Sequence, residues 1–241
     1  FNFIYFTSLI MKIIELKNVN KKFILHNQKG TVLKVLKNIN LEIKTGECIA
    51  LVGKSGIGKS TFLKMLYGNY LPSSGEINIY NNNKINIANT LEHQIINLRR
   101  YFIGYVSQFL RVLPRVPIIE IVSDTLKQQS LFDEHSLIKI KKLLSELNIQ
   151  ESMWNLSPLT FSGGEQQRVN LAKTLIGNYS ILLLDEPTAS LDDINKSIVI
   201  DMIKSKLKKD VTIIVIVHDK KIRNEICTRE INLEKYIPND N

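Results

Sequence analysis

A short apolar segment that runs into a glycine-rich loop constrains the fold of this chain more than any other feature. Residues 48–52, CIALV, are uniformly apolar and stop at Gly53, as expected of a strand buried on both faces of a sheet. The next residues, GKSGIGKST, fit the spacing G-x-x-x-x-G-K-[ST], and a helix is expected to begin near Ser60. This order of strand, loop and helix predicts an α/β domain whose loop binds phosphate.

The residue types of the loop suit a nucleoside triphosphate. Its glycines let successive backbone N–H groups face one point, where the following helix adds its positive end. Lys59 is expected to pair with the β- and γ-phosphates, and Ser60 to offer its hydroxyl to Mg²⁺. The loop residues assigned to nucleotide binding are Gly53, Ser55, Gly56, Gly58, Lys59, Ser60 and Thr61. A chance glycine-rich turn is the alternative, and the flanking strand and helix argue against it.

A second apolar strand delivers two carboxylates. Residues 181–184, ILLL, precede Asp185 and Glu186, and α/β sheets bind ligands at the carboxyl ends of such strands. Asp185 is expected to hold Mg²⁺ through water, and Glu186 to orient and deprotonate an attacking water molecule. A buried strand that ends in a capping acid is the plainer interpretation of this run taken alone.

Residues 162–165, SGGE, have two interpretations. Ser162 is expected to be a helix N-cap, and Glu165, three residues later, completes a capping box. Gly163 and Gly164 would in addition let phosphate oxygens approach the backbone closely. The segment lies shortly before Asp185 in the sequence, which favours the second interpretation.

In this order the three segments resemble the nucleotide-binding domain of the ABC-type ATPases. The resemblance covers nearly all of residues 11–233 and implies a P-loop NTPase (RecA-like) fold, with a parallel-sheet core, an antiparallel β subdomain and a helical insert. It also implies an ATPase that uses ATP and Mg²⁺ and works as a homodimer or a heterodimer. In that family the Ser-Gly-Gly segment contacts ATP held by the other subunit, so Ser162, Gly163, Gly164 and Glu165 are assigned to nucleotide binding. Phe161 replaces the usual leucine, and Glu165 an often-found glutamine; both variants occur in the family.

The same resemblance assigns roles to four further residues. His218 corresponds to a switch histidine that contacts the γ-phosphate, and Gln108 to the glutamine that links Mg²⁺ and water to the helical insert. Asp192 lies in a loop that crosses the dimer interface, and Phe23 corresponds to the aromatic residue that stacks on adenine. Taken alone, a structural histidine, a solvated glutamine and a core phenylalanine are the plainer interpretations.

Composition limits the remaining possibilities. The chain is 44% hydrophobic and 23% charged, and we expect one ATPase domain over residues 11–238, with a helical subdomain over about 109–165. No apolar run reaches the roughly 20 residues of a spanning helix, so no membrane insertion is expected. The net charge of +9 comes from scattered lysines, which argues against nucleic-acid binding. Two cysteines form no disulfide framework and fit a cytoplasmic location. Residues 1–10 are expected to be upstream of a native start at Met11, or disordered.

Stretches outside the shared motifs resemble one group within the family, PhnL, the ABC-type subunit of the bacterial carbon–phosphorus lyase system. These stretches are residues 23–28, 66–72, 106–115, 160–170 and 222–224, together with Trp154. The resemblance implies a role in phosphonate breakdown, associated with formation of α-D-ribose 1-methylphosphonate 5-triphosphate, with lyase core subunits as partners. Residues 109–116, which include Arg111 and Arg115, would contact such a partner.

Two other functions remain open from the sequence. One is the ATPase subunit of a transporter of the lipoprotein-release or macrolide-efflux type, which shares the short layout and the glutamine–phenylalanine pair at Gln108. The other is a binding module that senses ATP without turnover. The presence of both Glu186 and His218 argues against that last function.

Overall fold

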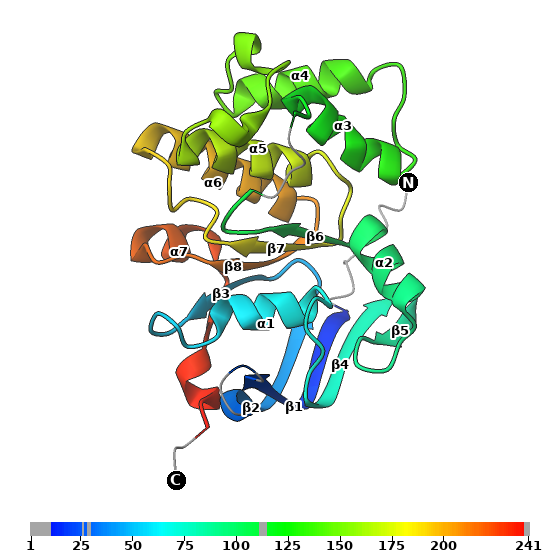
Figure 1. The fold of residues 1–241 in the computed structure, drawn as a ribbon, viewed down its shortest axis with the longest axis vertical. Helices are drawn as coiled ribbons and strands as arrows, with labels where there is room; N and C mark the ends of the chain where they lie inside the picture. The colour runs from blue at the N-terminus through cyan, green and yellow to red at the C-terminus, as the bar shows by residue number, and fades with distance from the viewer. Residues whose placement is uncertain (1–10, 26, 28–29, 111–114, 239–241) are drawn as a thin grey trace, which may run out of the picture.

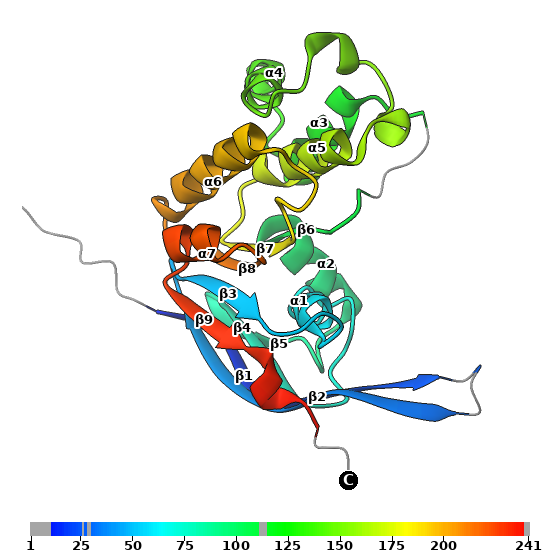
Figure 2. The ribbon, with the colours of Figure 1, turned by 90° about the vertical axis from the view of Figure 1, so that its left-hand side faces the viewer.

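The computed structural model describes residues 11–25, 27, 30–110 and 115–238, so the expectation for residues 1–10 lies outside the described residues. Two sheets are flanked by helices (Figures 1 and 2). The strands are β1 (Lys12–Leu25), β2 (Thr31–Lys44), β3 (Cys48–Val52), β4 (Ser74–Asn81), β5 (Asn83–Asn86), β6 (Ile103–Val106), β7 (Ile181–Asp185), β8 (Thr212–Ile216) and β9 (Arg229–Asn232). The helices are α1 (Lys59–Leu66), α2 (Glu92–Tyr101), α3 (Ile118–Gln128), α4 (Ser136–Glu146), α5 (Gly163–Leu175), α6 (Asp193–Leu207) and α7 (Lys220–Ile226), with short 3₁₀ turns η2 (Glu151–Met153), η3 (Pro158–Thr160) and η4 (Leu233–Tyr236).

The central sheet is parallel, with strand order β6-β7-β8-β3-β9. Successive side chains of a strand point to opposite faces, so its apolar residues divide between two cores. Leu182 and Leu184 of β7 belong to the core shared with α3, α4, α5 and α6, whereas Ile181 and Leu183 belong to the core shared with α1 and the second sheet. The uniformly apolar strands predicted at 48–52 and 181–184 are confirmed, and both are buried on two faces.

The second sheet is antiparallel, with order β2-β1-β4-β5. It supplies the expected antiparallel subdomain, which packs against the face of the parallel sheet that also carries α1. Strand β5 follows β4 at once and was not predicted from the sequence. Asn82 adopts a left-handed backbone with φ 54°, which lets Asn81 pair with Asn83 across a tight turn.

The helical subdomain packs over the opposite face, as Figure 2 shows for α3, α4 and α5. Ile140, Leu144 and Leu147 are buried in this core, whereas Leu137, in the first turn of α4, is 46% exposed. Helix α2 was not predicted, because Leu98 is its only fully buried residue and its periodicity is weak. Residues 111–114 of the predicted partner-contact segment lie outside the described residues, while Phe109 is exposed.

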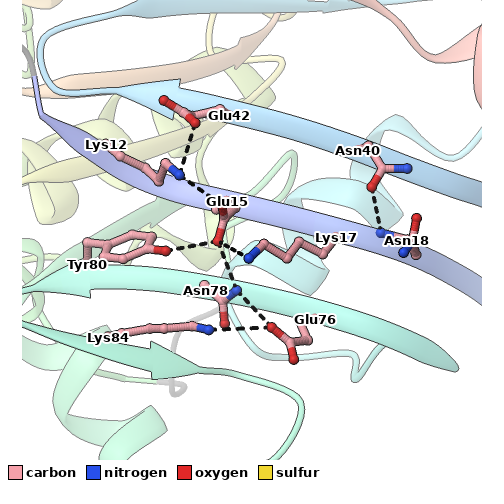
Figure 3. Close-up of polar contacts among 10 residues, drawn as sticks. All are labelled: Lys12, Glu15, Lys17, Asn18, Asn40, Glu42, Glu76, Asn78, Tyr80 and Lys84. Carbon is pink, nitrogen blue, oxygen red and sulfur yellow. Dashed lines mark hydrogen bonds and ion pairs between the residues drawn. The ribbon is translucent and has the colours of Figure 1, made fainter.

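A polar network covers the outer side of β1, β2 and β4 (Figure 3). The carboxylate of Glu15 lies 2.8 Å from Lys12 Nζ, accepts a 2.8 Å hydrogen bond from the Tyr80 hydroxyl, and also contacts Lys17 and Asn78. Its side chain is only 12% exposed. The bond to Lys12, with help from Tyr80, lowers the pKa of Glu15 from its ordinary value near 4.5 to about 2.

This depressed pKa predicts a pH-dependent contribution to stability. Because the folded pKa is the lower one, the contribution is complete above about pH 5 and is lost as the pH falls toward 2. We expect Glu15→Gln to lower the free energy of unfolding by about 1–2 kcal/mol at neutral pH and by less at pH 3. Glu42→Gln is the matched control, since Glu42 also pairs with Lys12 but is 46% exposed. Urea unfolding across pH 3–7 measures both, and an equal effect of the two variants at every pH would contradict the prediction.

Candidate active site

The loop between β3 and α1 has a backbone that requires glycine at its end. Gly58 has φ 106° and is the N-cap of α1. A Cβ atom at this position would lie 2.7 Å from Val35 Cγ1 on β2. Both the left-handed backbone and the close neighbour therefore exclude larger residues. At Gly56, by contrast, a Cβ atom would meet nothing within 4 Å, so this part of the loop is open to a ligand.

Lys59 is the cation of the loop. It is 7% exposed, and its Nζ donates hydrogen bonds to the carbonyl oxygens of Gly53 and Lys54, at 2.8 and 3.0 Å. The ammonium group thus spans the loop at the N-terminus of α1, where backbone N–H groups and the helix dipole also favour an anion. Ser55 and Gly56 are exposed, and Thr61 lies partly buried in the first turn of α1.

Ser60 and Asp185 meet beside this loop. The Ser60 hydroxyl donates to Asp185 Oδ1 at 3.0 Å, which joins α1 to the end of β7. Asp185 is 2% exposed, and burial raises the pKa of its carboxyl. A hydroxyl and a carboxylate in contact, next to a phosphate-binding loop, form the oxygen donor set that Mg²⁺ takes together with phosphate oxygens and water. The residues present therefore fit the predicted Mg²⁺ site.

Two residues, each after the end of a strand, converge on the carboxylate of a residue that follows a third strand. Gln108 Nε2, after β6, donates to Glu186 Oε2 at 3.1 Å, and His218 Nε2, after β8, lies 2.9 Å from Glu186 Oε1. Glu186 itself follows β7 and has φ 53°, a left-handed conformation that non-glycine residues rarely adopt. This strained backbone turns the side chain toward its two partners. A carboxylate so oriented can accept a proton from a water molecule.

The SGGE segment forms the start of α5. The Ser162 hydroxyl accepts a hydrogen bond from the Glu165 backbone at 3.3 Å, and the Glu165 carboxylate accepts one from the Ser162 backbone at 2.9 Å. The predicted capping box is therefore present, and the bonds from Ser162 lower the pKa of Glu165. Ser162 and Gly163 are exposed. Asp192 caps the next helix, α6, by accepting from the Asn195 backbone at 2.8 Å.

The two glycines of this segment have different surroundings. A Cβ atom on Gly164 would lie 2.6 Å from the Ser190 carbonyl oxygen, whereas one on Gly163 would meet only the Ser190 hydroxyl oxygen, at 4.0 Å. Gly164 therefore lets α5 pack against the loop before Asp192, a role that the sequence did not distinguish. Gly163 remains open toward solvent, and approach of a ligand to the backbone stays a prediction for it.

This difference predicts opposite effects of the same substitution. We expect Gly164→Ala to lower the free energy of unfolding by about 1–3 kcal/mol, because the Ser190 backbone must shift. Gly163→Ala is the matched control, which we expect to be neutral or slightly stabilising, since alanine favours a helix by about 0.5–1 kcal/mol over glycine. Thermal or urea unfolding of the purified chain measures both. Equal losses in the two variants would contradict the packing role of Gly164.

Two contacts near the site were not predicted from the sequence, and one predicted residue, Phe23, makes its contact away from the main cluster. The Tyr105 hydroxyl donates to Asp185 Oδ2 at 3.1 Å, and Asn170 Nδ2 on α5 donates to the Ser107 carbonyl oxygen at 2.6 Å. The position of Tyr105, three residues before Gln108, is the only sequence signal for the first contact. Phe23 lies edge-on to Tyr70, with ring centroids 5.3 Å apart, and its role in stacking on adenine stays a prediction.

The phosphate-binding loop and the SGGE segment lie on different sides of the parallel sheet. Helix α1 packs on one face and α5 on the other, as Figures 1 and 2 both show. A cavity of about 1020 Å³ opens between the two halves and reaches Ser60, Gln108 and Asp185. It is also lined by Lys64, Arg99, Arg100 and Lys173. In the described part of the chain, no helix has both the length and the apolar content needed to cross a membrane.

The family model and the relatives that match this chain are all described as ABC transporter or ATP-binding transport proteins. The family model described as ABC transporter matches residues 36–189. The methionine import ATP-binding protein MetN of Lactobacillus acidophilus is 32% identical over 226 residues, which are 93% of this chain and 63% of that protein. The arginine transport ATP-binding protein ArtP of Haemophilus influenzae is 32% identical, over 83% of this chain and 82% of that protein. The macrolide export ATP-binding/permease protein MacB of Haemophilus ducreyi is 34% identical over 86% of this chain, which spans only 29% of MacB.

Solved structures agree with these sequence relatives. A dimeric post-hydrolysis state of the ATP-binding cassette MJ0796, bound to ADP and Pi, matches with a TM-score of 0.82 and 30% sequence identity. The match covers 91% of this chain and 94% of that one. A second dimeric structure of MJ0796, described as a bacterial ABC transporter cassette, matches with a TM-score of 0.81. The P-loop NTPase fold of the ABC type, predicted from the sequence, is thereby confirmed.

Proposed function

This chain belongs to the ABC transporter family of ATP-binding proteins, and we propose that it binds and hydrolyses ATP at the carboxyl ends of β3, β6, β7 and β8. The observation that carries this proposal is the convergence of Gln108 and His218 on the Glu186 carboxylate, beside the loop that holds Lys59. A nucleotide-binding protein without turnover has no need to orient a carboxylate from two sides and to strain its backbone.

Each residue of the site has a distinct part in this reaction. Lys59 and the loop backbone bind the β- and γ-phosphates, exchanging the carbonyl contacts of the ammonium group for phosphate oxygens. Ser60 and Asp185 would hold Mg²⁺, which would neutralise charge on the phosphate oxygens. Glu186 accepts the proton of the attacking water, and Gln108 and His218 hold its two carboxylate oxygens in position.

We further propose that the functional unit is a dimer with composite sites. Ser162 and Gly163 are exposed, and α5 packs on the face of the sheet opposite α1, so the SGGE segment is available to a nucleotide held by another subunit. Both MJ0796 structures are described as dimeric, and one contains ADP and Pi. Contacts between Gly164 and the loop before Asp192 join the two segments that would face the partner.

For the process that ATP drives, we favour transport across a membrane. The relatives MetN, ArtP and MacB are described as import, transport and export proteins. From the sequence alone, phosphonate metabolism was the first candidate and transport the second; these relatives put transport first. The surface next to Gln108 is suited to a partner subunit, because Phe109 is 73% exposed there, beside the cavity lined by Lys64 and Arg99. Motion of a partner at this surface would reach Gln108 directly.

The carbon–phosphorus lyase system is the second candidate. It is favoured by the stretches outside the shared motifs, such as residues 66–72 and 160–170, and it would make lyase core subunits the partners. Under this alternative the chain hydrolyses ATP by the same residues, and turnover drives rearrangement of a complex that forms α-D-ribose 1-methylphosphonate 5-triphosphate. The two candidates therefore differ in the partner and share the site.

Affinity purification separates these candidates. The tagged full chain is recovered from its native host with and without mild detergent, and co-purifying proteins are identified by mass spectrometry. We expect an integral membrane permease in the detergent sample, and the matched variant Phe109→Asp should recover less of it. Recovery of phosphonate-metabolism subunits in both samples, with no permease, would overturn transport in favour of the second candidate. Phosphate release by the purified chain, with Lys59→Ala as the background, tests hydrolysis independently of the partner.

A further inference from the structure

We propose that Tyr105 is a positioning residue of the Mg²⁺ site, whose hydroxyl fixes the orientation of the Asp185 carboxylate and couples it to the strand that leads to Gln108. The inference rests on the proposed function in one respect only, namely that Asp185 takes part in Mg²⁺ binding. The Tyr105 hydroxyl donates to the Asp185 carboxylate, so Tyr105 would act on the metal site through Asp185.

The hydrogen bonds of Asp185 are the first observation. Its Oδ1 accepts from the Ser60 hydroxyl at 3.0 Å, and its Oδ2 accepts from the Tyr105 hydroxyl at 3.1 Å. One donor comes from the phosphate-binding loop and the other from the neighbouring strand β6. With a donor on each oxygen, the plane of the carboxylate is fixed. Since Asp185 is 2% exposed, bulk water is poorly placed to replace a donor that is removed.

The backbone register explains why Tyr105 reaches this carboxylate. Strands β6 and β7 are parallel, and Tyr105 pairs with Leu183, two residues before Asp185 on the same strand. Side chains two residues apart on a strand lie on one face, so the long phenol ring extends along β7 toward its carboxyl end. Phenylalanine at this position would keep the ring but would not reach Asp185 with a donor.

The ring of Tyr105 is itself held in place. It stacks at a tilt on Tyr67, at the end of α1, with centroids 5.1 Å apart. The guanidinium of Arg99 lies 5.0 Å from the Tyr67 ring centroid, and Arg99 Nε donates to the Tyr67 carbonyl oxygen at 2.9 Å. The ends of α1 and α2 therefore support the phenol ring. A supported donor fixes its acceptor more firmly than a mobile one does.

The location of Tyr105 gives this bond a mechanical consequence. Gln108 follows Tyr105 by three positions, and Asn170 on α5 donates to the Ser107 carbonyl oxygen between them. A displacement of this segment, by a partner subunit at Phe109 for example, moves Tyr105 together with Gln108. The metal site and the water-orienting glutamine would then respond to the same movement.

Packing alone is the competing explanation, and Tyr105→Phe distinguishes it, because the substitution keeps the stack on Tyr67. Tyr67→Phe is the matched control, since it removes a hydroxyl from the other ring of the same stack. Binding of Mn²⁺ to the full chain with ADP is followed by the electron paramagnetic resonance signal of free Mn²⁺. We expect Tyr105→Phe to weaken Mn²⁺ binding by about 10-fold, as for the loss of an outer partner of a metal ligand, and Tyr67→Phe to change it by less than about twofold.

Two further measurements complete the test. The Mg²⁺ concentration for half-maximal phosphate release should rise about 10-fold in Tyr105→Phe, whereas ADP binding in excess EDTA should stay within about twofold of the wild type. Unchanged Mn²⁺ affinity in Tyr105→Phe, or equal weakening in both variants, overturns the proposal. If the wild-type chain binds Mn²⁺ with ADP but releases no phosphate, hydrolysis is what fails, and the Mn²⁺ comparison still decides the role of Tyr105.

Discussion

Replacing Glu186 with glutamine should reduce ATP hydrolysis by about 10³-fold while leaving ATP binding within a few-fold of the wild type. Glutamine has nearly the same shape as glutamate and can still contact Gln108 and His218, which lie 3.1 and 2.9 Å from the two carboxylate oxygens. It cannot accept a proton from water. The expected loss therefore reports the chemistry of the carboxylate rather than a change of structure.

The measurement combines phosphate release with equilibrium binding of a fluorescent ATP analogue. Gln108→Ala and His218→Ala serve as graded controls, and each should cost less than Glu186→Gln, about 10–100-fold, because Glu186 keeps its other partner. Lys59→Ala should instead weaken binding itself. Equal, background rates of release in the wild type and Glu186→Gln would favour a module that senses ATP without hydrolysing it.

The resemblance to the ABC-type ATPases, and not the residues alone, assigned Gln108 and His218 to the site of Glu186, and the structure supplies a physical reason why the three residues meet. Gln108, Glu186 and His218 each follow an apolar strand, and parallel strands bring their carboxyl ends to one edge of a sheet. The apolar run 181–184 could be identified as a strand from the sequence, because β7 is buried on both faces of the sheet. The capping box at Ser162 is likewise local in the chain, and the structure contains it as expected.

Other features depend on contacts between distant segments and could not be predicted. Gly163 and Gly164 are equivalent in the sequence, and only the approach of the Ser190 carbonyl oxygen distinguishes them. The sulfur atoms of Cys48 and Cys227 lie 3.7 Å apart in the structure, although 179 positions separate them in the chain. The two free thiols therefore form a contact that cysteine spacing did not indicate.

Replacing Ser162 with arginine should spare ATP binding to the loop at Lys59 but prevent ATP-dependent dimerisation. Ser162 is exposed at the start of α5, so the larger side chain projects from the chain without disturbing its core. In a dimer with composite sites, the same side chain would enter the space that the partner's nucleotide needs. Hydrolysis should then fall by about 10²-fold or more, since each site loses its contacts from the second subunit.

A matched substitution separates obstruction from loss of the helix cap. Ser162→Ala removes the hydroxyl that accepts from the Glu165 backbone, and should cost about 1 kcal/mol of stability without blocking the interface. Both changes are made in the Glu186→Gln background, where ATP persists, and dimers are counted by light scattering during size-exclusion chromatography. We expect Glu186→Gln and Ser162→Ala to dimerise with ATP, and Ser162→Arg to remain monomeric. Dimers of Ser162→Arg would contradict the composite site, whereas a monomeric Glu186→Gln parent would indicate a heterodimer with a related subunit.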